Sequence, residues 1–292
     1  MNKMGFVAIG QAGGNIGQLL EKKGYPVMYL NTSTEDLDTI KDGKYKHHIQ
    51  NGEGCNKDRN KAKQLIVDDY DAVADMIDNT LKTEFIFVIF SAGGGTGSGA
   101  GPMLVDMLAS DGRSVGIITV IPSAQESIKT QINAYECFKE LVEIDNSSCC
   151  FILDNDKGKD RLAINTIFVN ALHAFLQIPE RYHSKKGNID NAEIIESLAD
   201  ITDITTATGE PWDSFRAYTP KESVILLSGL SYPVDRLDKL QAQVNDNRES
   251  IIKNLSGGKG TKLEAGFDFL EADRQVKKPE KVSRNDIFKK YL

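Results

Sequence analysis

The segment Gly93-Gly94-Gly95-Thr96-Gly97-Ser98-Gly99 constrains the fold of this chain more than any other stretch. It follows the apolar run 85–90, which is typical of a buried strand, and precedes 102–108, which has the pattern of a helix. Glycines at a strand-to-helix turn let the backbone approach a ligand closely. The helix start adds free N–H groups and the positive end of the helix dipole. We therefore predict an anion site that fits nucleotide phosphates, with a flexible linker as the alternative.

The N-terminal part repeats this arrangement. A short apolar strand at 5–9 leads through a glycine-rich turn into an amphipathic helix; the turn consists of Gly10, Gln11, Ala12, Gly13, Gly14 and Asn15. Because the complete G-x-G-x-x-G spacing is missing, this turn alone indicates either a nucleotide loop or close packing of the helix on its strand. The next strand, 27–30, ends at Asn31 and Thr32, at the edge where parallel sheets contact ligands.

A third glycine turn precedes a helix predicted over 59–79, and it contains Gly52, Glu53, Gly54, Cys55 and Asn56. Lys57 and Arg59 stand at the start of that helix, where cations are unfavourable unless an anion lies near. Both a binding loop and a solvated loop fit this pattern.

Two further strands, 114–121 and 149–153, flank a helix predicted over 127–144. The first ends at Pro122, shortly before Glu126, and the second ends shortly before Asn155. Alternation of strands and helices predicts an α/β fold with a doubly wound parallel sheet.

We divide the chain into a nucleotide-binding domain (1–160), a long central helix (161–180), a loop with the following helix (181–200), a smaller α+β domain (201–272) and a basic tail (273–292). Asp190 and Glu193 flank a helix start near Asn191, a spacing that simple capping explains. The tail carries seven Lys or Arg from 274 onward against Glu280 and Asp286. It is read either as a docking segment, whose end forms a short helix, or as a frayed end.

The composition limits the class of protein. A net charge of -7 argues against a general nucleic-acid binder. The cysteines show no metal-ligand spacing and no metal site is predicted; the pair His47-His48 reads as a surface turn. The absence of a membrane-spanning run or a signal-peptide pattern favours a cytoplasmic location.

Taken in order, these motifs resemble the tubulin/FtsZ superfamily of polymerising GTPases. The segment 93–99 resembles the family's glycine signature, and the segments at 10–15, 31–32, 52–56 and 122–126 resemble its other nucleotide loops. Asn165 on the central helix matches the guanine-binding position, with Asn155 as a second base contact. The resemblance is clear over about residues 5–230. Because the chain is short beside eukaryotic tubulins and its tail is basic, it most resembles plasmid- and phage-encoded tubulin-like proteins of the TubZ and PhuZ type.

The resemblance implies that the chain binds GTP or GDP with Mg²⁺ and polymerises head-to-tail with itself. It also implies that Asn188, Asp190 and Glu193 of one subunit complete the GTP site of the next, although the family often has Asp where Glu193 stands. Since no Walker-type lysine follows the glycine loops, an isolated subunit is expected to hydrolyse GTP slowly.

The expected role is segregation or positioning of plasmid or phage DNA, with the tail contacting a DNA-binding adaptor. An FtsZ-like division protein is the first alternative. A Rossmann-type dinucleotide enzyme with Glu35 as ribose partner, and a filament regulator that binds without hydrolysing, are more remote.

Overall fold

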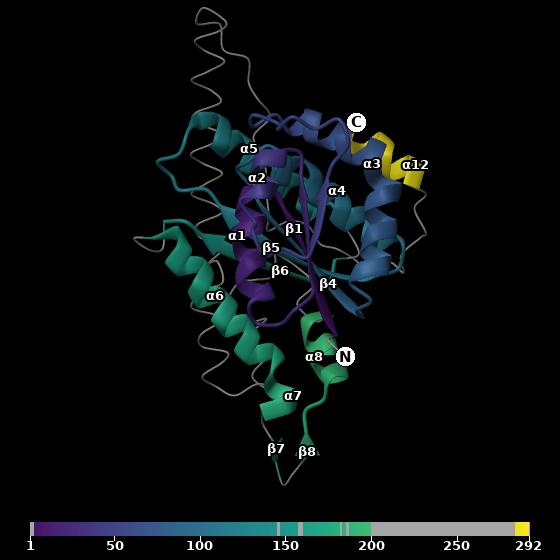
Figure 1. Ribbon diagram of the computed structural model, residues 1–292, viewed down its shortest axis with the longest axis vertical. Helices are drawn as coiled ribbons and strands as arrows, with labels where there is room; N and C mark the ends of the chain where they lie inside the picture. Colours follow the sequence, from purple (N-terminus) through teal and green to yellow (C-terminus); the bar gives the residue numbers. More distant parts are fainter. Residues whose placement is uncertain are drawn as a thin grey trace, which may run out of the picture.

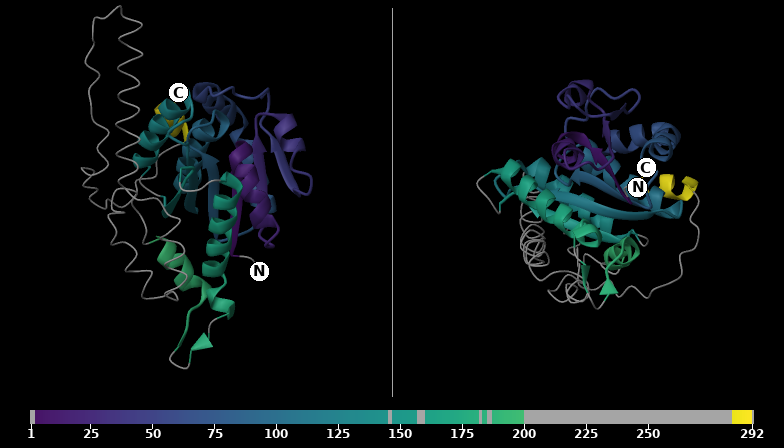
Figure 2. Two further views of the ribbon diagram at one scale, coloured as in Figure 1. Left: turned by 90° about the vertical axis from the view of Figure 1, so that its left-hand side faces the viewer. Right: turned by 60° about the horizontal axis from the view of Figure 1, so that its bottom comes forward.

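The computed structural model describes residues 3–144, 147–156, 160–181, 183–184, 187–199 and 284–291. Their main feature is a six-stranded sheet with helices on both faces (Figures 1 and 2). Its strands are β1 (Met4–Ile9), β2 (Val27–Asn31), β3 (Tyr45–His48), β4 (Phe85–Ser91), β5 (Ser114–Ile121) and β6 (Cys149–Asp154). They are all parallel and lie in the order β3-β2-β1-β4-β5-β6. The doubly wound α/β sheet is therefore confirmed, whereas the predicted α+β domain at 201–272 lies outside the described residues.

Helices cover both faces of this sheet. They are α1 (Gly10–Glu21), α2 (Thr34–Asp38), α3 (Arg59–Thr80), α4 (Thr96–Ser110), α5 (Ile128–Val142), α6 (Arg161–Leu176), α7 (Ile178–Arg181), α8 (Asn191–Ala199) and α12 (Arg284–Tyr291); β7 (His183–Ser184) and β8 (Gly187–Asn188) form a small antiparallel pair. A separate property of these helices is their length and polarity. Among the described helices, none is both long enough and apolar enough to cross a lipid bilayer.

Successive strand residues face two separate apolar cores. Val7 and Ile9 join the core with α3, α4, α5 and α12, whereas Phe6 and Ala8 join the core with α1, α6 and α8. A strand buried on both faces needs apolar residues at every position, and this explains the continuous apolar runs in the sequence.

Several elements differ from the sequence-based expectation. The turn predicted at 10–15 is the first part of α1, and α4 begins at Thr96 rather than near residue 102. The pair His47-His48 belongs to β3, so the prediction of a surface turn was wrong. The Nε2 atom of His47 lies 2.6 Å from a carboxylate oxygen of buried Asp69. The tail residues 284–291 form the expected short helix, but it is packed on the body rather than frayed.

The C-terminal helix α12 is held by both apolar and polar contacts. Ile287 and Tyr291 are buried in the core with α3 and α4. The Tyr291 hydroxyl donates to Asp106 Oδ2 at 3.2 Å, and Lys290 Nζ donates to the same oxygen at 3.0 Å. Burial, together with the neighbouring Asp106 carboxylate, raises the pKa of Tyr291.

One proline creates a vacancy in the hydrogen bonding of α4. Pro102 has no N–H, so it cannot donate to the carbonyl of Ser98 four residues earlier. Arg59 supplies the missing donors, because its Nε and Nη2 atoms lie 3.2 and 3.0 Å from that oxygen. The guanidinium also pairs with Glu140 of α5, which Lys63 shares. A buried cation thereby joins the starts of α3 and α4 to α5.

We expect Arg59→Met to lower the free energy of unfolding by about 3–5 kcal/mol, because it leaves the Ser98 carbonyl without the donors that replace Pro102 and weakens the pairing of Glu140. Urea unfolding followed by circular dichroism measures this loss. Arg161→Met is the matched control: the Arg161 side chain is 60% exposed in its ion pair with Glu126, so its loss should cost less than about 1 kcal/mol. Equal losses for the two variants would contradict the assignment.

Candidate functional site

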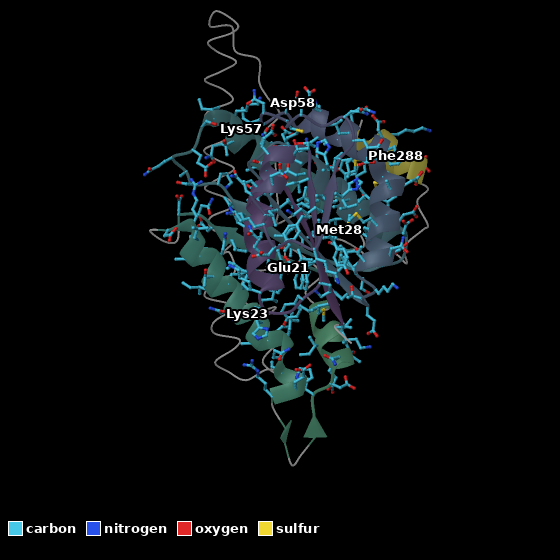
Figure 3. The ribbon with its side chains drawn as sticks, viewed as in Figure 1. Glu21, Lys23, Met28, Lys57, Asp58 and Phe288 are labelled. Atoms are coloured by element: carbon cyan, nitrogen blue, oxygen red, sulfur yellow. The ribbon has the colours of Figure 1, made fainter. Side chains whose placement is uncertain are left out.

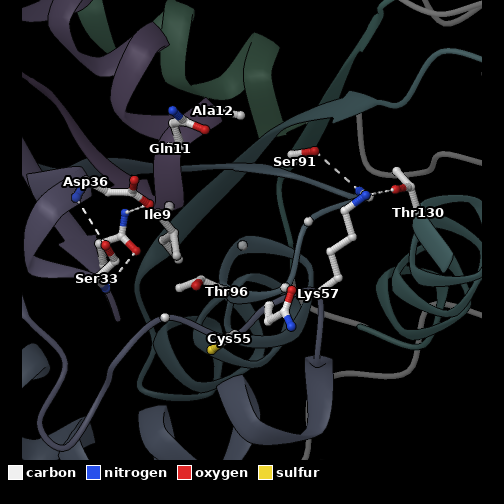
Figure 4. A pocket seen from close by; sticks show the side chains of 18 of the residues that line it. Ile9, Gln11, Ala12, Ser33, Asp36, Cys55, Lys57, Ser91, Thr96 and Thr130 are labelled. Carbon is white, nitrogen blue, oxygen red and sulfur yellow. Dashed lines mark hydrogen bonds between the residues drawn. The ribbon is translucent and has the colours of Figure 1, made fainter. Parts of the chain in front are cut away.

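A cavity of about 400 Å³ lies at the carboxyl edge of the sheet, between the ends of β1 and β4. The strand order reverses between these two strands, and parallel sheets bind ligands at such a reversal. Figure 4 shows side chains that line it. The lining residues are Ile9, Gly10, Gln11, Ala12, Asn31, Ser33, Asp36, Gly54, Cys55, Asn56, Lys57, Ser91, Gly93, Gly94, Gly95, Thr96, Gly97, Glu126 and Thr130.

Two helices begin at this cavity without a side-chain cap. α1 follows Ile9 and α4 follows Gly95, and neither of these residues caps its helix with a side chain. In contrast, α2, α3, α5 and α6 are capped by Ser33, Asp58, Ser127 and Asp160. The first N–H groups of α1 and α4 are therefore available to a ligand, with the positive end of each dipole behind them.

The backbone at Gly10 brings these two helix starts together. Gly10 has φ +69°, a conformation that favours glycine, and a Cβ there would lie 3.5 Å from the backbone nitrogen of Gly97. The N-terminal glycine turn and the segment 93–99 consequently form one continuous backbone surface.

The loop at 54–57 packs tightly against the segment 93–99. A Cβ at Gly95 would lie only 2.8 Å from the backbone nitrogen of Lys57. Lys57 itself has φ 61°, and Asn56 before it has φ 43°. Side chains behind the loop hold its carbonyl groups: Lys129 Nζ donates to Asn56 at 3.1 Å and Asn133 Nδ2 donates to Lys57 at 3.0 Å. The strained loop is thus fixed from behind.

Polar side chains complete the wall at both ends. Asn31 Oδ1 accepts the backbone N–H of Ser33 at 3.2 Å, and Asn31 Nδ2 donates to Asp36 at 3.3 Å. On the opposite side, Glu126 Oε1 accepts from Arg161 at 3.0 Å, which links the cavity to the first residue of α6.

The structure gathers much of the predicted site at this cavity. Gly10, Gln11, Ala12, Asn31, Gly54, Cys55, Asn56, Gly93, Gly94, Gly95, Thr96, Gly97 and Glu126 line it. Nine other predicted nucleotide-binding residues do not line it: Gly13, Gly14, Asn15, Gly52, Glu53, Ser98, Pro122, Asn155 and Asn165. Gly13 and Gly14 are buried within α1. For these two glycines, close packing of the helix explains the sequence pattern better than a nucleotide loop. Asn165 is buried on α6 one turn beyond Arg161, and Asn155 follows β6.

Sequence reasoning did not assign Ser33, Asp36, Ser91, Lys57 or Thr130 to the site, yet all line the cavity. A signal existed for Ser33, since a serine directly after a strand and before acidic residues is a common helix cap.

Glu35, the expected ribose partner of a dinucleotide enzyme, does not line the cavity. Its carboxylate is exposed, and hydrogen bonds from its own backbone N–H and from the Ser33 hydroxyl keep the pKa of that carboxyl below its usual range. The neighbouring Asp36 faces the cavity instead.

Asp190 and Glu193 form a capping box at the start of α8. Asp190 Oδ1 accepts the backbone N–H groups of Ala192 and Glu193 at 2.8 and 3.0 Å, and Glu193 Oε2 accepts that of Asp190 at 2.7 Å. The capping interpretation is therefore correct for this conformation. α8 lies at the opposite end of the molecule from Lys57 (Figures 1 and 3). The two carboxylates do not belong to the cavity of their own chain.

The cavity wall offers a Mg²⁺ ion few ligands. Asp36 and Glu126 supply carboxylates, and Ser91 and Thr96 supply hydroxyls. In the described part of the chain, no group of three or more His, Cys, Asp or Glu side chains is arranged to hold a metal. These donors fit an ion that keeps several waters and arrives with phosphate oxygens, as Mg²⁺ commonly does.

Comparison with known proteins agrees with this geometry. Residues 3–162 match the Tubulin/FtsZ family, GTPase domain, and the chain belongs to this family. Among similar proteins is the tubulin-like protein TubZ of Clostridium botulinum C phage, which is 31% identical over 205 residues; the match covers 68% of this chain and 57% of that relative.

Solved structures of this family have the same fold. The crystal structure of Clostridium botulinum phage c-st TubZ has a TM-score of 0.66 at 23% identity, covering 85% of this chain and 99% of that one. CetZ2 from Haloferax volcanii, solved as a GTPγS-bound protofilament, has a TM-score of 0.59 at 25% identity, covering 68% of this chain and 63% of that one.

The contact between Gly95 and Lys57 yields a test of the cavity wall. Gly95→Ala should destabilise the chain by about 1–3 kcal/mol, because its Cβ would meet backbone atoms that cannot move freely. Gly94→Ala is the matched control, since a Cβ there meets nothing within 4 Å, and its effect should stay within about 0.5 kcal/mol. Thermal unfolding compares the two variants, and equal shifts would refute the close packing of the loop.

Proposed function

We propose that this chain is a GTP-binding, GTP-hydrolysing protein that polymerises head-to-tail into filaments. The observation that carries this proposal is the pair of uncapped helix starts, α1 and α4, which face one cavity where the strand order reverses. Such N–H groups bind phosphates without a cationic side chain. The family match and the GTPγS-bound CetZ2 protofilament support guanine nucleotide as the ligand.

The phosphates lie on Gly93–Gly97 and on the start of α1, and the base lies toward the start of α6. The ion pair of Glu126 with Arg161 supports this orientation, because it ties the cavity to that helix. Asn165, one turn further along α6, and Asn155 remain the proposed base contacts. Mg²⁺, held mainly by phosphate oxygens and water beside Asp36 or Glu126, would neutralise phosphate charge.

Hydrolysis uses the carboxylates of a second subunit. Helix α8, whose start carries Asp190 and Glu193, lies at the end of the molecule remote from Lys57 and the cavity, so head-to-tail stacking brings these carboxylates to the cavity of the next copy. There they orient and polarise the attacking water, and Asn188 lies beside them in sequence. A heterologous contact of this kind does not close, so it builds a filament.

The filament would act in the cytoplasm on plasmid or phage DNA through a DNA-binding adaptor. The phage TubZ relative supports this choice over an FtsZ-like division role. Within the described tail residues 284–291, α12 buries Ile287 and Tyr291 on its own chain, so these two side chains are not open to an adaptor.

The capping box lets catalysis be separated from helix capping. Asp190→Asn keeps a good cap at α8 but removes the charge, so it should bind GTP and assemble while its GTPase activity falls by about 100-fold or more. Glu193→Gln likewise keeps the box. Phosphate release across a concentration series, with light scattering for assembly, measures both properties.

Two outcomes would count against the proposal. Full assembly-dependent GTPase activity in Asp190→Asn would remove Asp190 from the reaction. A wild-type rate per subunit that does not rise with protein concentration would remove the shared site. Glu196→Gln, on an exposed position of the same helix, is the control and should keep wild-type activity.

A further inference from the structure

The Lys57 side chain runs along the phosphate-binding backbone. The backbone nitrogen of Lys57 lies against Gly95, because a Cβ built on that glycine would be only 2.8 Å from it. Its Nζ atom lies 2.6 Å from Thr130 Oγ1, and the methyl group of Thr130 abuts Gly93, where a Cβ would approach it to 2.5 Å. Lys57 therefore reaches from Gly95, beside its backbone, to Thr130, beside Gly93, and Figure 4 shows its side chain pointing at Thr130.

Among the described residues, the charge of Lys57 has no carboxylate partner. Its ammonium donates to two hydroxyls there, at 2.6 Å to Thr130 and 3.1 Å to Ser127. Neighbouring cations behave differently, since Arg59 and Lys63 both pair with Glu140. Within the described residues, Lys57 makes no ion pair, although Glu136 and Glu140 line a second cavity of about 500 Å³ that it also borders.

Because the backbone of Lys57 is fixed by its neighbours, its side chain has a defined direction toward Thr130. Asn133 fixes its carbonyl from behind, and its φ of 61° is one that non-glycine residues adopt only where the surroundings impose it. A phosphate on Gly93–Gly95 would compete with two neutral hydroxyls for the ammonium, and a charged acceptor forms the stronger bond.

We propose that Lys57 binds the terminal phosphate of the nucleotide and makes the site favour a triphosphate over a diphosphate. The inference rests on the proposed guanine-nucleotide site and adds to it a cation from the loop at 54–57, outside the turns at 10–15 and 93–99. When the terminal phosphate leaves, the ammonium returns to Ser127 and Thr130, so α5 and the loop at 54–57 are linked differently in the two states.

The test compares affinities of the full chain for GTPγS and GDP with Mg²⁺, by calorimetry at concentrations below assembly. Lys57→Gln should weaken GTPγS binding by about 10- to 100-fold, the loss expected for one hydrogen bond to a charged group, and GDP binding by less than about threefold. Lys57→Arg should recover most of the GTPγS affinity. Lys22→Gln, which removes the same charge at the far end of α1, should change neither affinity.

Each result decides the matter. Equal weakening of GTPγS and GDP in Lys57→Gln would overturn the inference in favour of loop positioning, and unchanged binding would reduce Lys57 to a tether between the loop and α5. Unfolding midpoints of the variants exclude misfolding as the cause. If the wild-type chain binds neither nucleotide, the proposed function fails as well; if it binds both and only the discrimination by Lys57 is missing, the proposed function stands.

Discussion

A buried guanidinium determines how the cavity is assembled. Arg59 is the first residue of α3, directly after the loop that carries Lys57, and its charge needs partners because it is removed from water. It finds them in the carbonyl that Pro102 leaves free in α4 and in Glu140 of α5. The proline that weakens α4 thus creates the contact that fixes three helices around the turn Gly93–Gly95.

The remaining architecture follows from the parallel sheet. Parallel strands deliver all their carboxyl ends to one edge, and the reversal of strand order between β1 and β4 opens a space there. In α2, α3, α5, α6 and α8, the side chain of the residue before the helix accepts one or more of the first N–H groups, whereas α1 and α4 have no such cap. The absence of a cap is therefore as informative as the presence of glycine.

The sequence made the central strands predictable because burial on both faces demands continuous apolar runs. It did not reveal β3, whose residues Tyr45–His48 lie at the sheet edge and show no apolar pattern. The start of α4 was misplaced because glycines favour turns in isolation, although tertiary contacts hold them in a helix here. In the sequence, Lys57 stands out only as an unfavourable charge at a helix start. Its position beside Gly93–Gly95 depends on the folded backbone, which the sequence does not show.

The docking of α12 has a mechanical consequence. α8 and α12 both pack into the cores of the sheet domain, so the intervening chain, 200–283, is anchored to the same body at each end. Tension on the chain between these two helices would be shared by two covalent connections to the sheet domain. The connection through α12 depends on the burial of Ile287 and Tyr291 and on the hydrogen bonds from Lys290 and Tyr291 to Asp106 of α4, so no strand of the sheet is part of it. The C-terminal helix would then act as a second tether for the chain that precedes it.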